Sequence, residues 1–188
     1  MGGAYFVTIC TSDRSHVFGE IHNEEIQLSE IGTTAQACWH EIPKHFPSIE
    51  LGAFIVMPNH VHGSIILFDD SRRGVQLNAP FKINAPTKNH FSRISPKRNS
   101  LGLIVRTYKA AVTTRCLKQG YHDFRWQRSF FDHVIRNHAA HERISNYILT
   151  NPPRWELDIE NARRSGHDDF DDWLDTFKKT NPKTLGVY

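Results

Sequence analysis

The chain has few cysteines and no long hydrophobic run. Its three cysteines, Cys10, Cys38 and Cys116, are far apart and form no CxxC pair, which excludes a disulfide framework and a thiolate zinc site. No apolar run approaches the roughly 18 residues that cross a bilayer. The first residues lack a basic region followed by a long apolar stretch, so nothing indicates export. We expect a soluble cytoplasmic protein with reduced cysteines in its core and no membrane contact.

Acidic residues are scarce in the middle of the chain. Between Arg72 and Arg154 there are sixteen Lys or Arg and three acids, whereas eight acids and five bases follow from Glu156 onward. A basic stretch of this kind attracts polyanions over a long range. The middle of the chain is therefore where we expect a nucleic acid to bind, although a solvated basic surface would give the same balance.

The length of 188 residues, with 39% hydrophobic residues, predicts one globular domain with an appendage. Apolar and β-branched runs predict strands at 4–11, 49–57, 61–68 and 126–135, and a hairpin or an irregular strand within 16–27. Helical periodicity predicts helices after Ser29, from Ser100 to about Gly120, and over 139–150. Helices that separate antiparallel pairs favour an α+β fold over a doubly wound parallel sheet.

Two regions stand apart from these elements. Residues 69–99 are rich in basic residues and lack periodicity, which predicts a long loop inserted into a domain that spans residues 1–155. Residues 156–188 form an acidic C-terminal extension, in which Phe170, Trp173 and Phe177 follow the spacing of one amphipathic helix. We expect this extension to compete with DNA for the basic surface and so to weaken non-specific binding.

His60, Val61 and His62 form the most informative tripeptide. In a strand, residues two apart point to the same face, so both imidazoles would project side by side. Such a pair can bind zinc, manganese or magnesium, and imidazole ligands favour the first two. Two histidines on a solvated strand face are the alternative in a chain with twelve histidines.

A third ligand would have to come from elsewhere. Tyr147 and Asn151 are four residues apart on a predicted helix, so they would share one face. A core tyrosine and a helix-capping asparagine are the plainer interpretations of these two residues.

Three blocks now become recognisable: MPNHVHGSIIL, WQRSFFDHVIRN and RISNYILTNPPRW. Their order and separation resemble the HUH single-tyrosine transposases, and in particular the REP-associated tyrosine transposase branch, over residues 5–155. The resemblance implies a ferredoxin-like antiparallel sheet flanked by helices. It also implies a DNA transposase that nicks and rejoins single-stranded or hairpin DNA, including REP-like repeats, through a covalent 5′-phosphotyrosine.

Carried over residue by residue, the resemblance makes Tyr147 the nucleophile. His60 and His62 become ligands of a divalent metal, Mg²⁺ or Mn²⁺, and Asn151 a further ligand. Insertion-sequence relatives have Gln one turn after the tyrosine, whereas Asn occurs in the REP-associated branch. Tyr108 and Tyr121 are rival nucleophiles that lie outside the matching block.

Cations of the basic middle are expected to contact DNA phosphates. The candidates are Lys82, Lys88, Arg93, Lys97, Arg98, Arg106, Lys109, Arg128, Arg136 and Arg143. His133, in the second block, is a possible assisting residue, and a hydrogen-bonded histidine on a strand fits it equally well. The resemblance allows either a monomer or a homodimer.

Two other functions remain open from the sequence. One is a domesticated, catalytically silent binder of structured single-stranded DNA. In such a protein the basic middle of the chain would bind the DNA, and His60 would not be needed. The other is a metal-dependent RNA or phosphodiester hydrolase that turns over without a tyrosine adduct.

Overall fold

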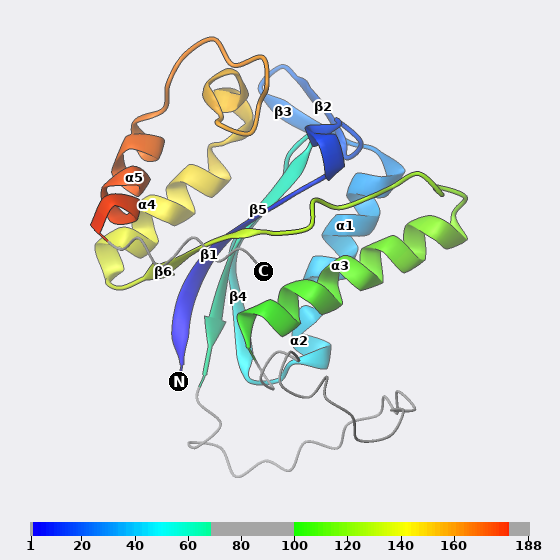
Figure 1. Ribbon diagram of the computed structural model, residues 1–188, viewed down its shortest axis with the longest axis horizontal. Helices are drawn as coiled ribbons and strands as arrows, with labels where there is room; N and C mark the ends of the chain where they lie inside the picture. Colours follow the sequence, from blue (N-terminus) through cyan, green and yellow to red (C-terminus); the bar gives the residue numbers. More distant parts are fainter. Residues whose placement is uncertain (1, 69–99, 181–188) are drawn as a thin grey trace.

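The computed structural model describes residues 2–68 and 100–180, and its centre is a four-stranded sheet (Figure 1). Neighbouring strands are antiparallel and follow the order β4-β5-β1-β6. The strands are β1 (Gly3–Cys10), β4 (Ile49–Val56), β5 (His60–Leu67) and β6 (Phe131–Ile135). Because a helix precedes β4 and another precedes β6, this order is the ferredoxin-like arrangement, and the predicted α+β fold is confirmed.

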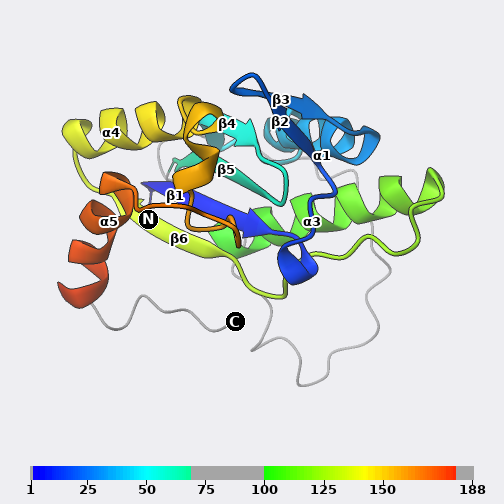
Figure 2. The same cartoon turned by 90° about the horizontal axis from the view of Figure 1, so that it is seen from above.

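Helices cover both faces of the sheet (Figure 2). The helices are α1 (Glu30–His40), α2 (Ile42–His45), α3 (Leu101–Lys118), α4 (His138–Leu149) and α5 (Asp169–Thr180), with short 3₁₀ turns η1 (Ser12–Arg14) and η4 (Pro152–Leu157). A separate two-stranded sheet pairs β2 (Gly19–His22) with β3 (Glu25–Leu28), which confirms the predicted hairpin. Within the described residues, no helix is both long enough and apolar enough to cross a membrane.

The register of β1 and β5 decides which side chains share a face. Thr8 pairs with His62 and Cys10 with His60, whereas Ile9 pairs with Val61 between them. Ile9 and Val61 are fully buried in the larger hydrophobic cluster, together with residues of α1 and α3. Alternation therefore turns both histidines to the opposite face, which α4 and α5 cover.

Side-chain caps explain where three helices begin. Ser29 Oγ accepts a hydrogen bond from Gly32 N at 3.0 Å, and Ser100 Oγ accepts one from Leu103 N at 3.3 Å. Asn137 caps α4 in the same way. Each cap satisfies an amide that has no partner within its own helix. The predicted starts after Ser29 and at Ser100 are confirmed.

The predicted strand over 126–135 is wrong in its first half, because β6 begins only at Phe131. Lys109 Nζ donates hydrogen bonds to the carbonyls of Gln127 at 2.8 Å and Ser129 at 2.9 Å. These contacts turn the carbonyls of residues 127–129 toward α3, and the Gln127 amide still donates to the carbonyl of Cys10 at 2.9 Å. Trp126 forms only an isolated bridge with Thr11.

The single helix predicted after Ser29 is divided in two. α1 ends at His40, and the short helix α2 follows with Pro43 in its first turn. The three cysteines are free and buried, as expected. The domain boundary at residue 155 stays a prediction, and the acidic extension after it contributes Phe170 and Leu174 to the same hydrophobic cluster as α4.

Candidate metal and tyrosine site

Two histidine side chains lie next to each other at the start of β5. The turn at Pro58 and Asn59 ends β4 and begins β5, so His60 and His62 are the first and third residues of the strand. Their ring centroids are 4.2 Å apart, and the two residues are 0% and 2% exposed. The predicted pair on one strand face is present, but it is buried rather than solvated.

Asn59 determines the tautomer of His60. Its Nδ2 donates hydrogen bonds to the carbonyls of Arg14 at 3.2 Å and Glu160 at 2.8 Å, which fixes the orientation of the amide. Asn59 Oδ1 therefore faces His60 Nδ1 at 2.8 Å and can only accept a hydrogen bond. His60 Nδ1 carries the proton, and Nε2 presents a lone pair to the interior.

His62 is held in the same manner from the neighbouring strand. Its Nδ1 lies 2.9 Å from Thr8 Oγ1, directly across the β1–β5 pair. A hydroxyl can accept from an Nδ1–H group, and in that tautomer Nε2 of His62 carries no proton. Both imidazoles thus have a polar partner on Nδ1, the usual arrangement of histidines that bind metals through Nε2.

A carboxylate that the sequence did not single out completes the cluster. Asp158 Oδ2 lies 3.8 Å from His60 Nε2 and 3.6 Å from His62 Nε2, and the Asp158 side chain is 0% exposed. It stands directly after η4, in the acidic extension. Nothing in the sequence distinguishes it from the seven other acids that follow residue 155.

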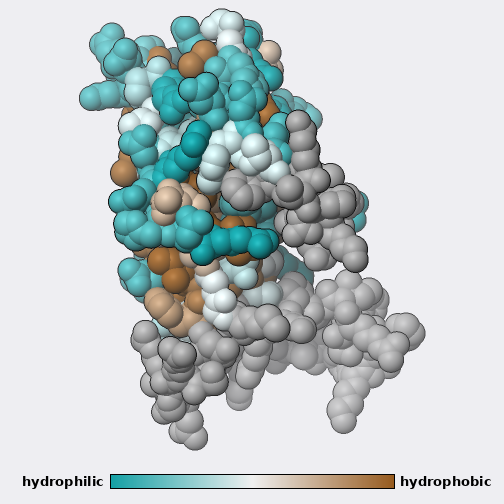
Figure 3. Space-filling view, turned by 90° about the vertical axis from the view of Figure 1, so that its left-hand side faces the viewer, coloured by the Kyte–Doolittle hydropathy of each residue, from teal (hydrophilic) through white to brown (hydrophobic). Residues whose placement is uncertain are grey.

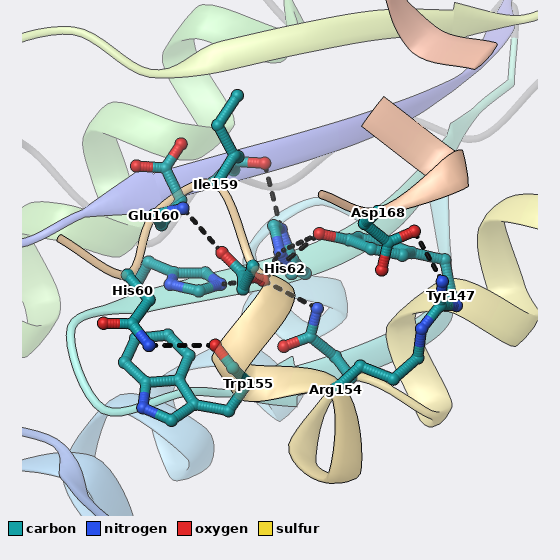
Figure 4. A network of polar contacts seen from close by, with 12 residues as sticks. His60, His62, Tyr147, Arg154, Trp155, Ile159, Glu160 and Asp168 are labelled. Carbon is teal, nitrogen blue, oxygen red and sulfur yellow. Dashed lines mark hydrogen bonds and ion pairs between the residues drawn. The ribbon is translucent and has the colours of Figure 1, made fainter. Parts of the chain in front are cut away.

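α4 places Tyr147 at this centre (Figure 4), and Asn151 lies just after the end of the helix. Tyr147 Oη donates to Asp158 Oδ2 at 3.2 Å and lies 3.4 Å from His62 Nε2. Asn151 Nδ2 donates to the same carboxylate oxygen at 2.8 Å. In Figure 4 the rings of His60 and His62 and the hydroxyl of Tyr147 point toward a common centre.

Tyr147 is closed off from solvent by α5. It is 3% exposed, and the Phe170 ring stacks on it at a centroid distance of 3.7 Å with an interplanar angle of 8°. Burial, followed by the charge of Asp158, raises the pKa of Tyr147 above its ordinary value. The phenol is therefore neutral in this arrangement.

The outer surface of α5 is polar, in contrast to its inner side. Asp169 and Asp172 are exposed, whereas Phe170 and Leu174 are buried. Figure 3 views the left-hand side of the molecule, and hydrophilic residues cover most of the upper part of its described surface. The amphipathic helix predicted for the extension is thus present, with Phe170 inward and Trp173 half-buried.

The residues at this centre fit a divalent metal. His60 Nε2 and Asn151 Oδ1 are buried atoms without a hydrogen-bond partner, and such atoms are rare in folded proteins. Burial, and then the neighbouring His62, lower the pKa of His60 to about 3, so its Nε2 lone pair is available. His60, His62 and Asp158 form the metal-compatible group found among residues 2–68 and 100–180, with ligand atoms within 4.8 Å of one another.

The rival tyrosines lie elsewhere. Tyr108 belongs to the cluster on the α1 and α3 face, where its Oη donates to the carbonyl of Ala35 at 3.2 Å. Tyr121 is bound to the Glu30 carboxylate. His133 is half-buried on β6 and meets the Trp173 ring edge-on at 6.0 Å. Its assisting role stays a prediction.

The predicted DNA-binding cations fall into three groups. Lys82, Lys88, Arg93, Lys97 and Arg98 lie outside the described residues. Arg106, Arg128 and Arg136 are exposed. Lys109 and Arg143 are engaged within the protein, Lys109 with carbonyls of 127–129 and Arg143 with the Asp169 carbonyl and the Trp173 ring. The phosphate contacts of all three groups stay predictions.

A basic groove opens beside the histidine end of the sheet. It has a volume of about 640 Å³ and is lined by 11–14 and 126–128. The lining includes two cations, Arg14 and Arg128, and one acid, Asp13, and Arg14 is also paired with Glu160. The adjoining residue Cys10 pairs with His60 across the sheet, so the groove lies next to the site. Arg14 was missed from the sequence because it precedes the basic middle of the chain.

The chain was compared with protein families, with individual protein sequences and with solved structures, and it resembles a protein in each of the last two groups. No protein-family profile matches it. It is 35% identical over 158 residues to an uncharacterized protein of Haemophilus influenzae, and the match covers 83% of each chain. A solved structure of a REP-associated tyrosine transposase bound to a REP hairpin is similar with a TM-score of 0.52 and 19% identity, over 81% of this chain and 68% of that chain. At this identity the likeness shows a common fold.

Proposed function

The chain belongs to one family with the Haemophilus influenzae protein and has the fold of the REP-associated tyrosine transposase, and from this premise we propose that it is an HUH single-tyrosine transposase. It would cut single-stranded or hairpin DNA and rejoin the ends through a covalent 5′-phosphotyrosine. The observation that carries this proposal is the position of the Tyr147 hydroxyl, 3.4 Å from His62 Nε2 in the buried histidine pair.

Tyr147 has the role of the nucleophile. Its Oη would form a bond to the phosphorus as the bond from phosphorus to the 3′ oxygen breaks. The phenol proton passes from Oη to solvent water, and the departing 3′ oxygen takes up a proton from solvent to become a hydroxyl, so the protons balance. The phosphodiester energy stays in the tyrosine linkage, so a second 3′ hydroxyl can reverse the step and join a new end without ATP.

His60 and His62 would hold the divalent ion through Nε2, and Mg²⁺ and Mn²⁺ are the candidates. Bound there, the cation supplies positive charge that polarises a phosphate oxygen and favours the phenolate. Asn59 and Thr8 keep the two rings oriented through Nδ1. Asn151 stays a candidate ligand through Oδ1, which has no partner in the structure.

The basic groove is the proposed entrance for the DNA strand. Arg14 and Arg128 line it, and Trp126 offers an aromatic surface at its edge. Cations that contact phosphates give affinity without reading the base sequence. The solved relative is bound to a REP hairpin, which makes hairpin DNA the first substrate class to test.

The test is the trapping of a covalent adduct on a denaturing gel. Wild type and Tyr147→Phe are incubated with a labelled library of hairpin-bearing single strands and Mn²⁺, and Tyr108→Phe serves as the control tyrosine. We expect an adduct with wild type and Tyr108→Phe and none with Tyr147→Phe. An adduct that survives in Tyr147→Phe, or none with wild type on any hairpin, contradicts the proposal.

A silent DNA binder is the second candidate, and the burial of Tyr147 beneath Phe170 favours it. In that case the basic groove would bind hairpins while the phenol stays inaccessible. Tight hairpin binding by wild type, without any adduct and without an effect of His60→Ala, would identify this function instead.

A further inference from the structure

We propose that Asp158 is the anionic third ligand of the metal held by His60 and His62, and that Asn151 positions this carboxylate. The inference rests on the proposed function, because it concerns the ion of the same site. The resemblance implies only His60, His62 and the side-chain amide of Asn151 as ligands. Asp158 goes beyond that set, because it lies outside all three blocks that carry the resemblance.

The distances from the Asp158 carboxylate to the two histidine nitrogens are the first argument. Asp158 Oδ2 lies 3.8 Å from His60 Nε2 and 3.6 Å from His62 Nε2. Nitrogen and oxygen ligands lie about 2.0–2.2 Å from a divalent ion, so two ligands of one ion can be at most about 4.4 Å apart. Both observed distances fit within that limit with little movement of the side chains.

The charge of the buried carboxylate is the second argument. Asp158 is 0% exposed, and among the described residues its ion-pair contacts are the two histidines. The nearby arginines are engaged elsewhere, Arg14 with Glu160 and Arg154 with Asp168. A buried charge requires a paired group or a metal. His60 Nε2 carries no proton, because Nδ1 donates to Asn59, and it has no hydrogen-bond partner. Asp158 Oδ2 already accepts hydrogen bonds from Tyr147 and Asn151. A cation between the two atoms would give Nε2 a partner and would neutralise the charge of the carboxylate.

Hydrogen bonds hold Asp158 in the required orientation. Its Oδ1 accepts from the Glu160 amide at 2.7 Å, which leaves Oδ2 turned toward the histidines. Asn151 Nδ2 donates to that Oδ2 at 2.8 Å. With the amide flipped, Asn151 Oδ1 would face a carboxylate oxygen at the same distance and repel it. The Nδ2 contact thus makes Asn151 a positioning residue for Asp158.

The experiment measures Mn²⁺ affinity of the full chain without DNA, by calorimetry and by the electron paramagnetic resonance signal of free Mn²⁺. The variants are Asp158→Asn, Asp158→Ala, Asn151→Ala and His60→Ala. Asp171→Asn is the matched control, because it removes another buried acidic charge that lies outside the donor cluster. Circular dichroism and thermal melting in EDTA establish that each variant is folded.

We expect Asp158→Asn and Asp158→Ala to weaken Mn²⁺ binding at least tenfold, and Asn151→Ala to weaken it less than Asp158→Ala. Asp171→Asn should stay within threefold of wild type. Binding by Asp158→Ala within threefold of wild type, or a larger loss in Asn151→Ala, overturns the inference, as does a wild type that binds no Mn²⁺. The adduct assay with Tyr147→Phe decides the proposed function separately, so the two failures are distinguishable.

Discussion

At the scale of single residues, the site depends on partners that hold the histidines rather than on the histidines alone. Asn59 precedes His60, and its amide is fixed by the carbonyls of Arg14 and Glu160. The Nδ1 proton of His60 follows from that orientation. The asparagine of the MPNHVH block therefore has a physical role that is separate from turn formation.

Asn59→Ala should lower Mn²⁺ affinity about 10–100-fold, the range typical for residues that orient a metal-binding histidine. Asn161→Ala is the control, since Asn161 is also buried and donates to a backbone carbonyl, that of Trp155, but does not contact a histidine. Isothermal titration of both variants checks the prediction. Equal affinities in the two variants would show that the tautomer of His60 is not set by Asn59.

Asp171 gives a pH-dependent prediction. Burial, and then Asp158 and Asp168, raise its pKa to about 6. The folded state therefore binds a proton that the unfolded state has released between about pH 4 and pH 6, and wild type loses stability as pH rises through this window. Asp171→Asn lacks this loss.

We expect Asp171→Asn to match wild type near pH 4 and to be more stable by about 1–3 kcal/mol at pH 7.5. Urea unfolding in EDTA at pH 4, 5.5 and 7.5 measures the difference. A gap that does not change with pH, or a wild type that is the more stable at pH 7.5, contradicts the assigned shift.

At the scale of elements, β5 contributes residues to both faces of the sheet. Its histidines face α4, whereas Gly63 faces α1 and lies against the Trp39 ring. That ring stacks on the Phe54 ring with a distance of 4.5 Å between the ring centroids. A Cβ added at Gly63 would lie 2.2 Å from Trp39 Cζ2. The glycine of HVHG is therefore a requirement of packing.

Gly63→Ala should destabilise the protein by about 1–3 kcal/mol through overpacking. Gly102→Ala, in the first turn of α3 with no atom within 4 Å of the added Cβ, should be neutral or stabilise by up to about 1 kcal/mol. Thermal unfolding of both variants compares them. A Gly63→Ala protein as stable as wild type would mean that Trp39 can move away from the strand.

The same elements show how far the sequence could predict the fold. Strong periodicity and capping residues gave β1, β5, α3 and α4 close to their true bounds. β6 was predicted too long because the contacts of Lys109 with carbonyls of 127–129 are tertiary and leave no local pattern. Asp158 could not be predicted for the same reason, since only the fold brings it to the histidines. The burial of Tyr147 under Phe170 likewise depends on the packing of α5.

At the scale of the whole molecule, charge is unevenly distributed. The net charge of +3 is small, but basic residues are concentrated in the middle of the sequence and acids in the extension. In the described part of the chain, Arg14 and Arg128 line the groove beside the site. α2, which carries Lys44, precedes β4 at the opposite end of the sheet from His60.

Arg128→Gln should weaken binding of single-stranded hairpin DNA and reduce the slope of log K against log salt concentration by about 0.7, the value for one lost phosphate contact. Lys44→Gln removes the same charge at the far end of the sheet and should leave the slope unchanged. Fluorescence anisotropy across a salt series measures both. Equal slopes for the two variants would place the DNA away from the groove.

The central claim is that Tyr147 becomes covalently linked to DNA. The most direct test is mass spectrometry of protease- and nuclease-treated reactions between the wild-type chain, Mn²⁺ and hairpin DNA. The account predicts one modified peptide, within RISNYILTNPPR, that carries a nucleotide 5′-phosphate on Tyr147. A nucleotide on another residue, or a 3′-phosphate linkage on Tyr147, would contradict the account.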